Sequence, residues 1–196
     1  MHAALVMRDK ETDSYWSIVT GDAIAGDRAG TPLEEWPLGE KAQWKDWVAR
    51  HPDTLVLSVD GEEHVENNPY DNYFTDDERT FRDLQVEDDR LPPKQSVYAF
   101  WYDDRPMAIS HAGTEGGLLA RIPDSEEFLL VWREPGSPVY ASSRAYVVPR
   151  PGSPEAAELL DSVRSGDIDG ARPANGFDTF WYTWVLVNPG TELITP

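Results

Sequence analysis

Short apolar and β-branched runs separated by polar turns dominate this chain. Two pairs of runs are joined by short charged segments at 10–13 and 103–105, which is the pattern of a β-hairpin. The predicted strands are 3–8, 15–20, 54–59, 96–102, 106–110, 116–122, 126–133 and 138–148. The pattern therefore predicts an antiparallel meander or a partial barrel.

A smaller number of segments favour helices. Residues 40–50 place apolar side chains at helical spacing, and a second helix is expected to begin at Ser153-Pro154 and to end at Gly166. Residues 177–187 are apolar throughout, so periodicity alone does not separate helix from strand there. Comparison with 40–50 favours a helix. The predicted fold class is α+β and mainly β, with about three short helices.

One tryptophan pattern occurs twice. The spacing Trp-x2-Trp-x3-His/Asn-Pro-x-Thr fits both 44–54 and 181–191, with His51 and Asn188 at equivalent places. Two Trp side chains at i and i+3 share one face of a helix, and the residue before Pro avoids the α conformation. We therefore interpret residues 1–196 as a single domain with two related halves, approximately 1–93 and 94–196. Each copy is predicted to be a helix that stops and leads into a strand.

The charge is strongly acidic, with 36 Asp and Glu against 17 Lys and Arg and a net charge of −19. Such a field repels nucleic acid and anionic membranes, and an acid-rich surface is typical of halophilic proteins. No apolar run is long enough for membrane insertion, and residues 1–9 do not form a signal peptide, so a soluble and by default cytoplasmic protein is expected. The absence of Cys excludes disulfides, thiolate metal sites and cysteine nucleophiles.

Aromatic side chains are the first candidates for ligand binding. Indole rings stack on sugars, flat rings and cations, and the acidic loop 60–93 carries further aromatics that would lie beside them. The structural alternative is that both tryptophan motifs simply anchor helices onto a sheet. The predicted ligand-binding residues are Trp16, Trp44, Trp47, His51, Tyr70, Tyr73, Trp181 and Trp184.

Catalytic and metal chemistry leave weaker signals. None of the four His residues pair at the spacing of a metal box, so His51 and His111 are only weak metal candidates and no cofactor is evident. An enzyme would require two or more polar side chains to converge in a cleft. The candidates are His51, Asp53, Lys94, Tyr98 and His111.

Several segments together resemble a known family. They are 5–9, 14–26, 44–54, 69–73, 90–94 and 177–184, and the most specific is Trp16 to Gly26. They are similar to the later half of the uncharacterised bacterial and archaeal family known as domain of unknown function 3179. That family usually carries an earlier Cys-Pro-Leu-Cys segment, which this chain lacks, and has Ala-Tyr-Pro-Leu where this chain has Pro106 to His111. The resemblance implies a fold and transfers no activity.

Three hypotheses for function follow. The first is a non-catalytic ligand-binding or structural domain, with a small molecule as the ligand. The second is an enzyme, or a metal- or redox-related enzyme remnant, that has lost its cysteine motif. The third is an assembly subunit that contributes to a shared site, as a homo-oligomer or with a partner that covers a sheet edge near 3–8. No nucleic-acid partner is expected in any of them.

Overall fold

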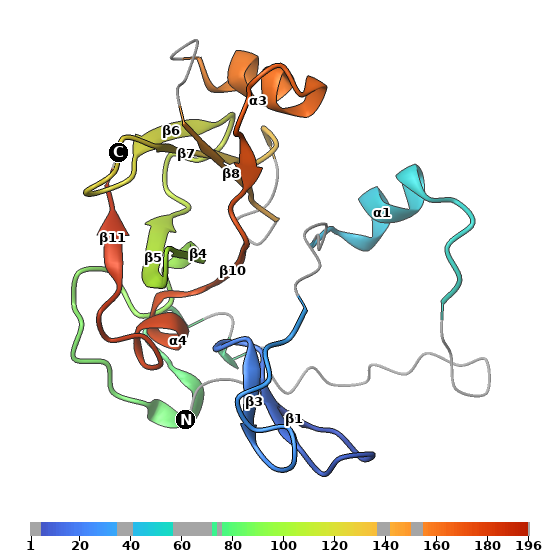
Figure 1. The fold of residues 1–196 in the computed structure, drawn as a ribbon, viewed down its shortest axis with the longest axis vertical. Coiled ribbons are helices and arrows are strands. Elements are labelled where there is room, and N and C mark those ends of the chain that lie inside the picture. Colours follow the sequence, from blue (N-terminus) through green and yellow to red (C-terminus); the bar gives the residue numbers. More distant parts are fainter. Residues whose placement is uncertain are drawn as a thin grey trace.

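A computed structural model describes residues 5–34, 41–56, 72–73, 76–136, 142–149 and 155–195. The fold is mainly β, as predicted, with three sheets and three α-helices in the described residues (Figure 1). Nearly all strand pairs are antiparallel, and none of the three described sheets closes into a barrel. The predicted meander is therefore confirmed.

The first sheet is a small antiparallel unit near the N-terminus. It has the order β1-β2-β3, from strands Val6–Arg8, Tyr15–Ser17 and Asp22–Ala25. The charged turn predicted between the first two strands is present, and the Asp9 carboxylate accepts the Glu11 N–H at 2.7 Å. Gly26 adopts φ +91, and a Cβ there would lie 2.5 Å from the Asp13 carbonyl oxygen, so only glycine fits.

The second sheet forms the centre of the molecule and has the order β10-β4-β5-β11. Its strands are β4 (Ser96–Tyr102), β5 (Arg105–Ser110), β10 (Gly176–Phe180) and β11 (Glu192–Ile194). The predicted β4–β5 hairpin is confirmed, and β11 lies parallel to β5. Six of the seven residues of β4 are buried, which means that both faces of this sheet are covered.

The third sheet packs on one face of the second. It has the order β6-β7-β8-β9, from Leu118–Arg121, Phe128–Trp132, Arg144–Val148 and Arg172–Pro173. Side chains of β4 and β5 meet those of β6, β7 and β8 in the largest apolar core. Helix α3 (Ala156–Ser165) covers the other side through Leu159 and Leu160, and Gly166 ends it in a left-handed conformation as predicted. Its expected beginning at Ser153 lies outside the described residues.

The two remaining helices differ in burial. Helix α1 (Trp44–Arg50) has no buried residue and stands to one side of the sheets (Figure 1). Helix α4 (Trp181–Val185) buries four of its five residues below β4 and β10. A short 3-10 turn (Phe81–Asp83) lies in the described part of the acidic loop.

Two boundary predictions are wrong in detail. The apolar stretch 177–187 was expected to be one helix, but residues up to Phe180 form β10 and the helix begins at Trp181. Pairing of 176–180 with β4 determines this boundary, and local pattern does not carry that information. Residues 54–56 are not a strand, while 57–59 lie outside the described residues.

Candidate functional site

The two tryptophan motifs have the same local backbone structure. The His51 N–H donates to the Trp47 carbonyl at 2.8 Å, and the Asn188 N–H donates to the Trp184 carbonyl at 2.9 Å. The Thr that follows each Pro then donates its N–H back to the carbonyl of His51 or Asn188, at 3.1 and 3.0 Å. In both places the sequence therefore produces a helical turn, a stop and a reversal of the chain.

The environments of the two motifs are opposite. Trp44 is 56% exposed, and Trp47 is half-buried. The Trp47 indole N–H donates to the Thr54 hydroxyl at 2.9 Å, and its ring lies 4.2 Å from the ring of His51. The first copy is therefore held together internally while its outer face remains open to solvent.

The second copy is enclosed. Trp181 and Trp184 are both 0% exposed and pack with Val97 and further small apolar side chains of the central sheet, and with Val19, which follows β2. Phe177 and Trp101 meet the Trp184 ring edge to face at 5.8 and 5.7 Å. In this copy the motif anchors α4 to the central sheet, because the indoles fill the space between them.

The remaining predicted aromatics lie elsewhere. Trp16 is half-buried on β2, where its register partner across the strand pair is Met7. The Tyr73 hydroxyl lies 2.7 Å from that of Tyr182, which places it beside the buried motif. Tyr70 lies outside the described residues. Trp47 and His51 are thus in contact on the same motif as the exposed Trp44, and Tyr73, Trp181 and Trp184 belong to the region of α4.

Lys94 is buried in the same region, with 8% of its surface exposed. Its ammonium donates to the carbonyl oxygens of Tyr73 and Asp76, the latter at 2.6 Å, and lies 4.2 Å from the centre of the Tyr73 ring. The Phe180 ring lies 5.7 Å away on another element. These carbonyls and rings compensate the buried positive charge. Lys94 thereby ties the acidic loop to the sheet.

Arg90 makes a second attachment of the loop. Its guanidinium donates to the Asp88 carboxylate and to the Thr191 carbonyl at 2.9 Å, and it lies 5.2 Å from the Trp181 ring. The hydrogen bond from Arg90 lowers the pKa of Asp88 below its usual value, with burial acting against it. The loop is therefore fastened across the outside of the second motif.

A buried polar cluster of His111, Ser143 and Asp178, of which only His111 was a predicted candidate, joins the ends of β5 and β8 to the middle of β10. The His111 Nε2 atom lies 2.6 Å from Asp178 Oδ1 and 3.2 Å from the Ser143 hydroxyl, and the Ser143 N–H donates to Asp178 Oδ2 at 2.8 Å. The side chains of His111 and Asp178 are only 3% and 6% exposed. Lys41 donates its ammonium to the Asp178 carbonyl at 3.0 Å, which attaches the start of the α1 segment here.

This Ser, His and Asp set does not have the geometry of a catalytic triad. In a triad the carboxylate holds one imidazole nitrogen so that the other is free to take the serine proton. Here Asp178 and Ser143 both contact the same Nε2 atom, so this carboxylate does not hold one imidazole nitrogen while the other faces the serine. The arrangement and its burial favour a structural link between β5, β8 and β10. The sequence feature that could have indicated this cluster is Asp178, which is the one acidic residue in the apolar run 177–187.

The other candidate catalytic residues lie in different parts of the described structure. The Tyr98 hydroxyl donates to the Ala174 carbonyl, His51 stacks on Trp47, and Asp53 is exposed after α1. The described residues contain no cluster of three or more His, Asp and Glu that would hold a metal ion. His51 and His111 lie in separate groups, one exposed and one buried.

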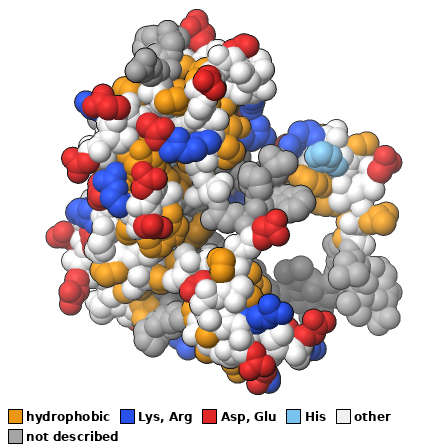
Figure 2. Space-filling model, viewed as in Figure 1, with side chains coloured by type: hydrophobic (Ala, Val, Ile, Leu, Met, Phe, Trp, Pro, Cys, Tyr) orange, Lys and Arg blue, Asp and Glu red, His pale blue; other side chains and the backbone are white. Residues whose placement is uncertain are grey.

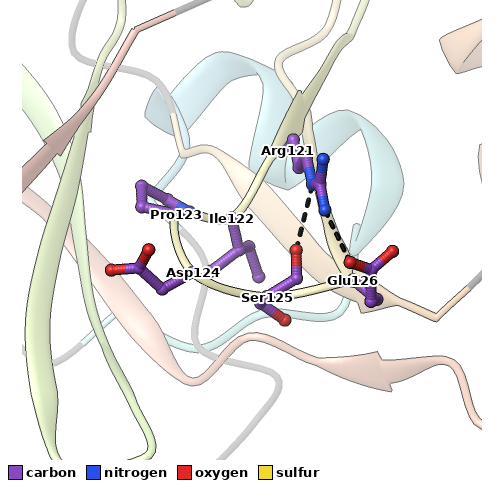
Figure 3. Close-up of a pocket in the computed structure, with 6 residues that line it drawn as sticks. All are labelled: Arg121, Ile122, Pro123, Asp124, Ser125 and Glu126. Atoms are coloured by element: carbon purple, nitrogen blue, oxygen red, sulfur yellow. Dashed lines mark hydrogen bonds and ion pairs between the residues drawn. The ribbon is translucent and has the colours of Figure 1, made fainter.

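A shallow hollow of about 450 Å³ lies at the turn between β6 and β7. Six consecutive residues, Arg121 to Glu126, line it, and the Arg121 guanidinium bonds the Ser125 carbonyl and the Glu126 carboxylate across its edge (Figure 3). All of these groups come from one turn, and among the described residues no second element brings polar groups toward a molecule bound there.

The fold and the site together define a mainly β protein with one buried and one exposed tryptophan motif. The chain belongs to the family described as protein of unknown function (DUF3179), whose model matches residues 1–191. This confirms the resemblance seen in the sequence. No curated protein and no solved structure matches the chain. Within the described residues, no helix has the length and apolar character needed to cross a membrane.

Proposed function

We propose that this chain is a non-catalytic binding domain that contacts its partner through the exposed tryptophan motif. The observation that carries the proposal is the contrast in burial between the two motifs: Trp181 is 0% exposed, whereas Trp44 at the same position is 56% exposed. The same backbone hydrogen bonds hold both helical turns. The exposed copy is thus a formed element whose Trp44 side chain is exposed in the part of the chain that the structure describes.

The surroundings of Trp44 favour a broad surface over a small-molecule pocket. Leu55 and Val56, which follow the motif, are 94% and 52% exposed, and basic side chains lie beside the hydrophobic ones on this segment (Figure 2). Trp and Arg are the residues most often found at the energetic centre of protein–protein contacts. Arg50 lies over the Trp47 ring at 5.7 Å, so both types are present here. We name the Trp44, Leu55 and Val56 side chains the arm surface.

The polar interior supports a non-catalytic role. His111 and Lys94, the two buried candidates for acid–base chemistry, contact Asp178 and backbone carbonyls that hold separate strands or loops together. Neither is presented to solvent.

Site-specific photo-crosslinking tests the proposal. A photoreactive phenylalanine analogue at position 44 is expected to crosslink to a macromolecule in cells, with the attached peptide identified by mass spectrometry. The same analogue at Leu186, which is exposed but outside the arm surface, is the matched control. Crosslinks from position 44 only to residues of its own chain, or no more than from position 186, would contradict a binding role for the arm surface.

A further inference from the structure

The buried copy of the tryptophan motif is covered by a segment of the acidic loop, residues 86–91, which we name the strap. The first and last side chains of the strap, both apolar, pack against the cluster that contains Trp181. The guanidinium of Arg90 lies 5.2 Å from the centre of the Trp181 ring and donates to the Thr191 carbonyl at 2.9 Å. One arginine therefore contacts the first and the last residue of the motif.

The strap itself orients this arginine. The Asp88 carboxylate accepts hydrogen bonds from the Nε and Nη2 atoms of Arg90 at 3.0 and 2.6 Å, and from its backbone N–H at 3.2 Å. Arginine suits the arrangement because its planar guanidinium stacks on a ring while its N–H groups donate to oxygen atoms. A carboxylate, an indole and a carbonyl thus surround one guanidinium.

The exposed copy presents two of these groups in the same backbone frame. Each helix begins at the first Trp of its motif, after a residue in extended conformation with φ −68 and ψ 142 in one copy and φ −84 and ψ 146 in the other. Each copy then ends with the same pair of backbone hydrogen bonds. The Trp44 ring and the Thr54 carbonyl therefore correspond to the Trp181 ring and the Thr191 carbonyl.

Both groups are available in the exposed copy. The Trp44 side chain is 56% exposed, and no donor in the described part of the chain bonds the Thr54 carbonyl. The Thr54 hydroxyl, by contrast, accepts the Trp47 indole N–H at 2.9 Å. The Arg50 guanidinium of the same segment lies over the other ring, that of Trp47, at 5.7 Å.

The charge beside the Thr54 carbonyl favours a cation. Asp53 directly precedes Thr54 and is exposed, whereas the buried copy has Gly190 at this place. The exposed copy therefore has its own carboxylate where the buried copy relies on Asp88 of the strap. The chain as a whole carries a net charge of −19, and this field attracts a cationic group.

We propose that the arm surface binds an arginine side chain of a partner protein. The guanidinium lies over the Trp44 ring and donates to the Thr54 carbonyl, as Arg90 does in the buried copy. This inference rests on the proposed function, because it gives the chemistry of the partner for the same Trp44 surface. The strap is the template, since it is the cover that one copy of this motif already has.

A peptide with the sequence of residues 86–93, in which Arg90 is the one basic side chain, is the probe. It is titrated into the isotope-labelled full chain at about 0.15 M salt, which screens the repulsion between two acidic molecules. The indole resonance of Trp44 and the backbone amide resonance of Thr54 are expected to shift together and to saturate. A peptide with citrulline in place of Arg90 has the same shape without the charge, and is expected to bind at least about 5-fold more weakly.

Protein variants locate the binding, with the Thr54 amide resonance as the readout. Trp44→Ala is expected to weaken binding of the arginine peptide at least about 10-fold, whereas Trp44→Phe keeps a ring face and is expected to lose less. Leu186→Ser, an exposed apolar side chain outside the arm surface, is expected to leave the affinity unchanged. Near-ultraviolet circular dichroism checks that each variant is folded.

Three results would overturn the inference. They are equal binding of the arginine and citrulline peptides, undiminished binding by Trp44→Ala, and a peptide that shifts the Trp181 indole resonance but not the Thr54 amide, which would show competition with the strap alone. Failure of the inference is distinguishable from failure of the proposed function. Crosslinks in cells from position 44 to a partner peptide without arginine would overturn the inference and leave the binding role intact, whereas crosslinks to an arginine-containing peptide would support both.

Discussion

Trp44 and Trp181 occupy the same position in two copies of one motif, but Trp44 is 56% exposed and Trp181 is fully buried. Their helical turns end with equivalent backbone hydrogen bonds. The difference therefore arises from what surrounds each copy. The second copy has a strand before it in the central sheet and β11 after it, whereas the described residues 41–56 that hold the first copy contain no strand.

The buried His111–Asp178 pair is predicted to stabilise the fold. Asp178→Asn replaces an acceptor of two hydrogen bonds in a buried site, and we expect a loss of about 1–3 kcal/mol in the free energy of unfolding. Urea denaturation followed by circular dichroism measures it. Asp77→Asn, at an exposed position, is the control and should change stability by less than about 0.5 kcal/mol. Equal stability of the two variants would show that the cluster is not a structural link.

Lys94 is predicted to hold the acidic loop against the sheet. Lys94→Met keeps the length of the side chain but leaves the carbonyls of Tyr73 and Asp76 without their donor, so we expect faster amide hydrogen exchange in peptides covering 76–84. Hydrogen–deuterium exchange with mass spectrometry measures this. The exposed Lys45→Met change should leave these peptides unaffected, and unchanged protection in Lys94→Met would contradict the role of Lys94.

The Glu127–Arg172 pair predicts a pH dependence of stability. Two 2.7 Å hydrogen bonds from Arg172 are the main cause that lowers the pKa of Glu127 below its ordinary value of 4.5, and Tyr102 adds a third. A lowered folded-state pKa contributes stability above the unfolded-state pKa, and this contribution is lost as the pH falls through the folded-state pKa. Since Arg172 is 46% exposed, we expect less than about 1 kcal/mol.

Unfolding free energies at about pH 7 and about pH 3 test this dependence. The Glu127→Gln variant should lose less stability than the wild type between the two pH values, since it has no carboxylate to protonate. An identical loss in both proteins would show that the pair does not contribute.

Local sequence predicted most of the sheet structure. Alternation of apolar runs with Asp-rich or Gly-rich turns locates β4, β5, β7 and β8. The left-handed Asp103 and Asp104 form the turn within the charged segment 103–105 that was expected between the first pair. The family resemblance also extends over nearly the whole chain.

The features that the sequence did not predict depend on contacts between residues far apart in the chain. Phe180 ends a strand and Trp181 begins a helix because β4 pairs with 176–180, and the apolar run itself is compatible with either. The cluster of His111, Ser143 and Asp178 forms only when three strands converge. Similarly, the two tryptophan motifs have nearly the same sequence pattern, and they differ in how deeply their Trp side chains are buried.

The central claim is that one tryptophan motif is part of the core and the other is free for binding. Denaturant unfolding of Trp44→Ala and Trp181→Ala at high dilution tests it most directly. The account predicts a loss of about 3–5 kcal/mol for Trp181→Ala, because a large cavity opens beneath the sheet, and less than about 1 kcal/mol for Trp44→Ala. A loss for Trp44→Ala as large as that for Trp181→Ala would contradict it.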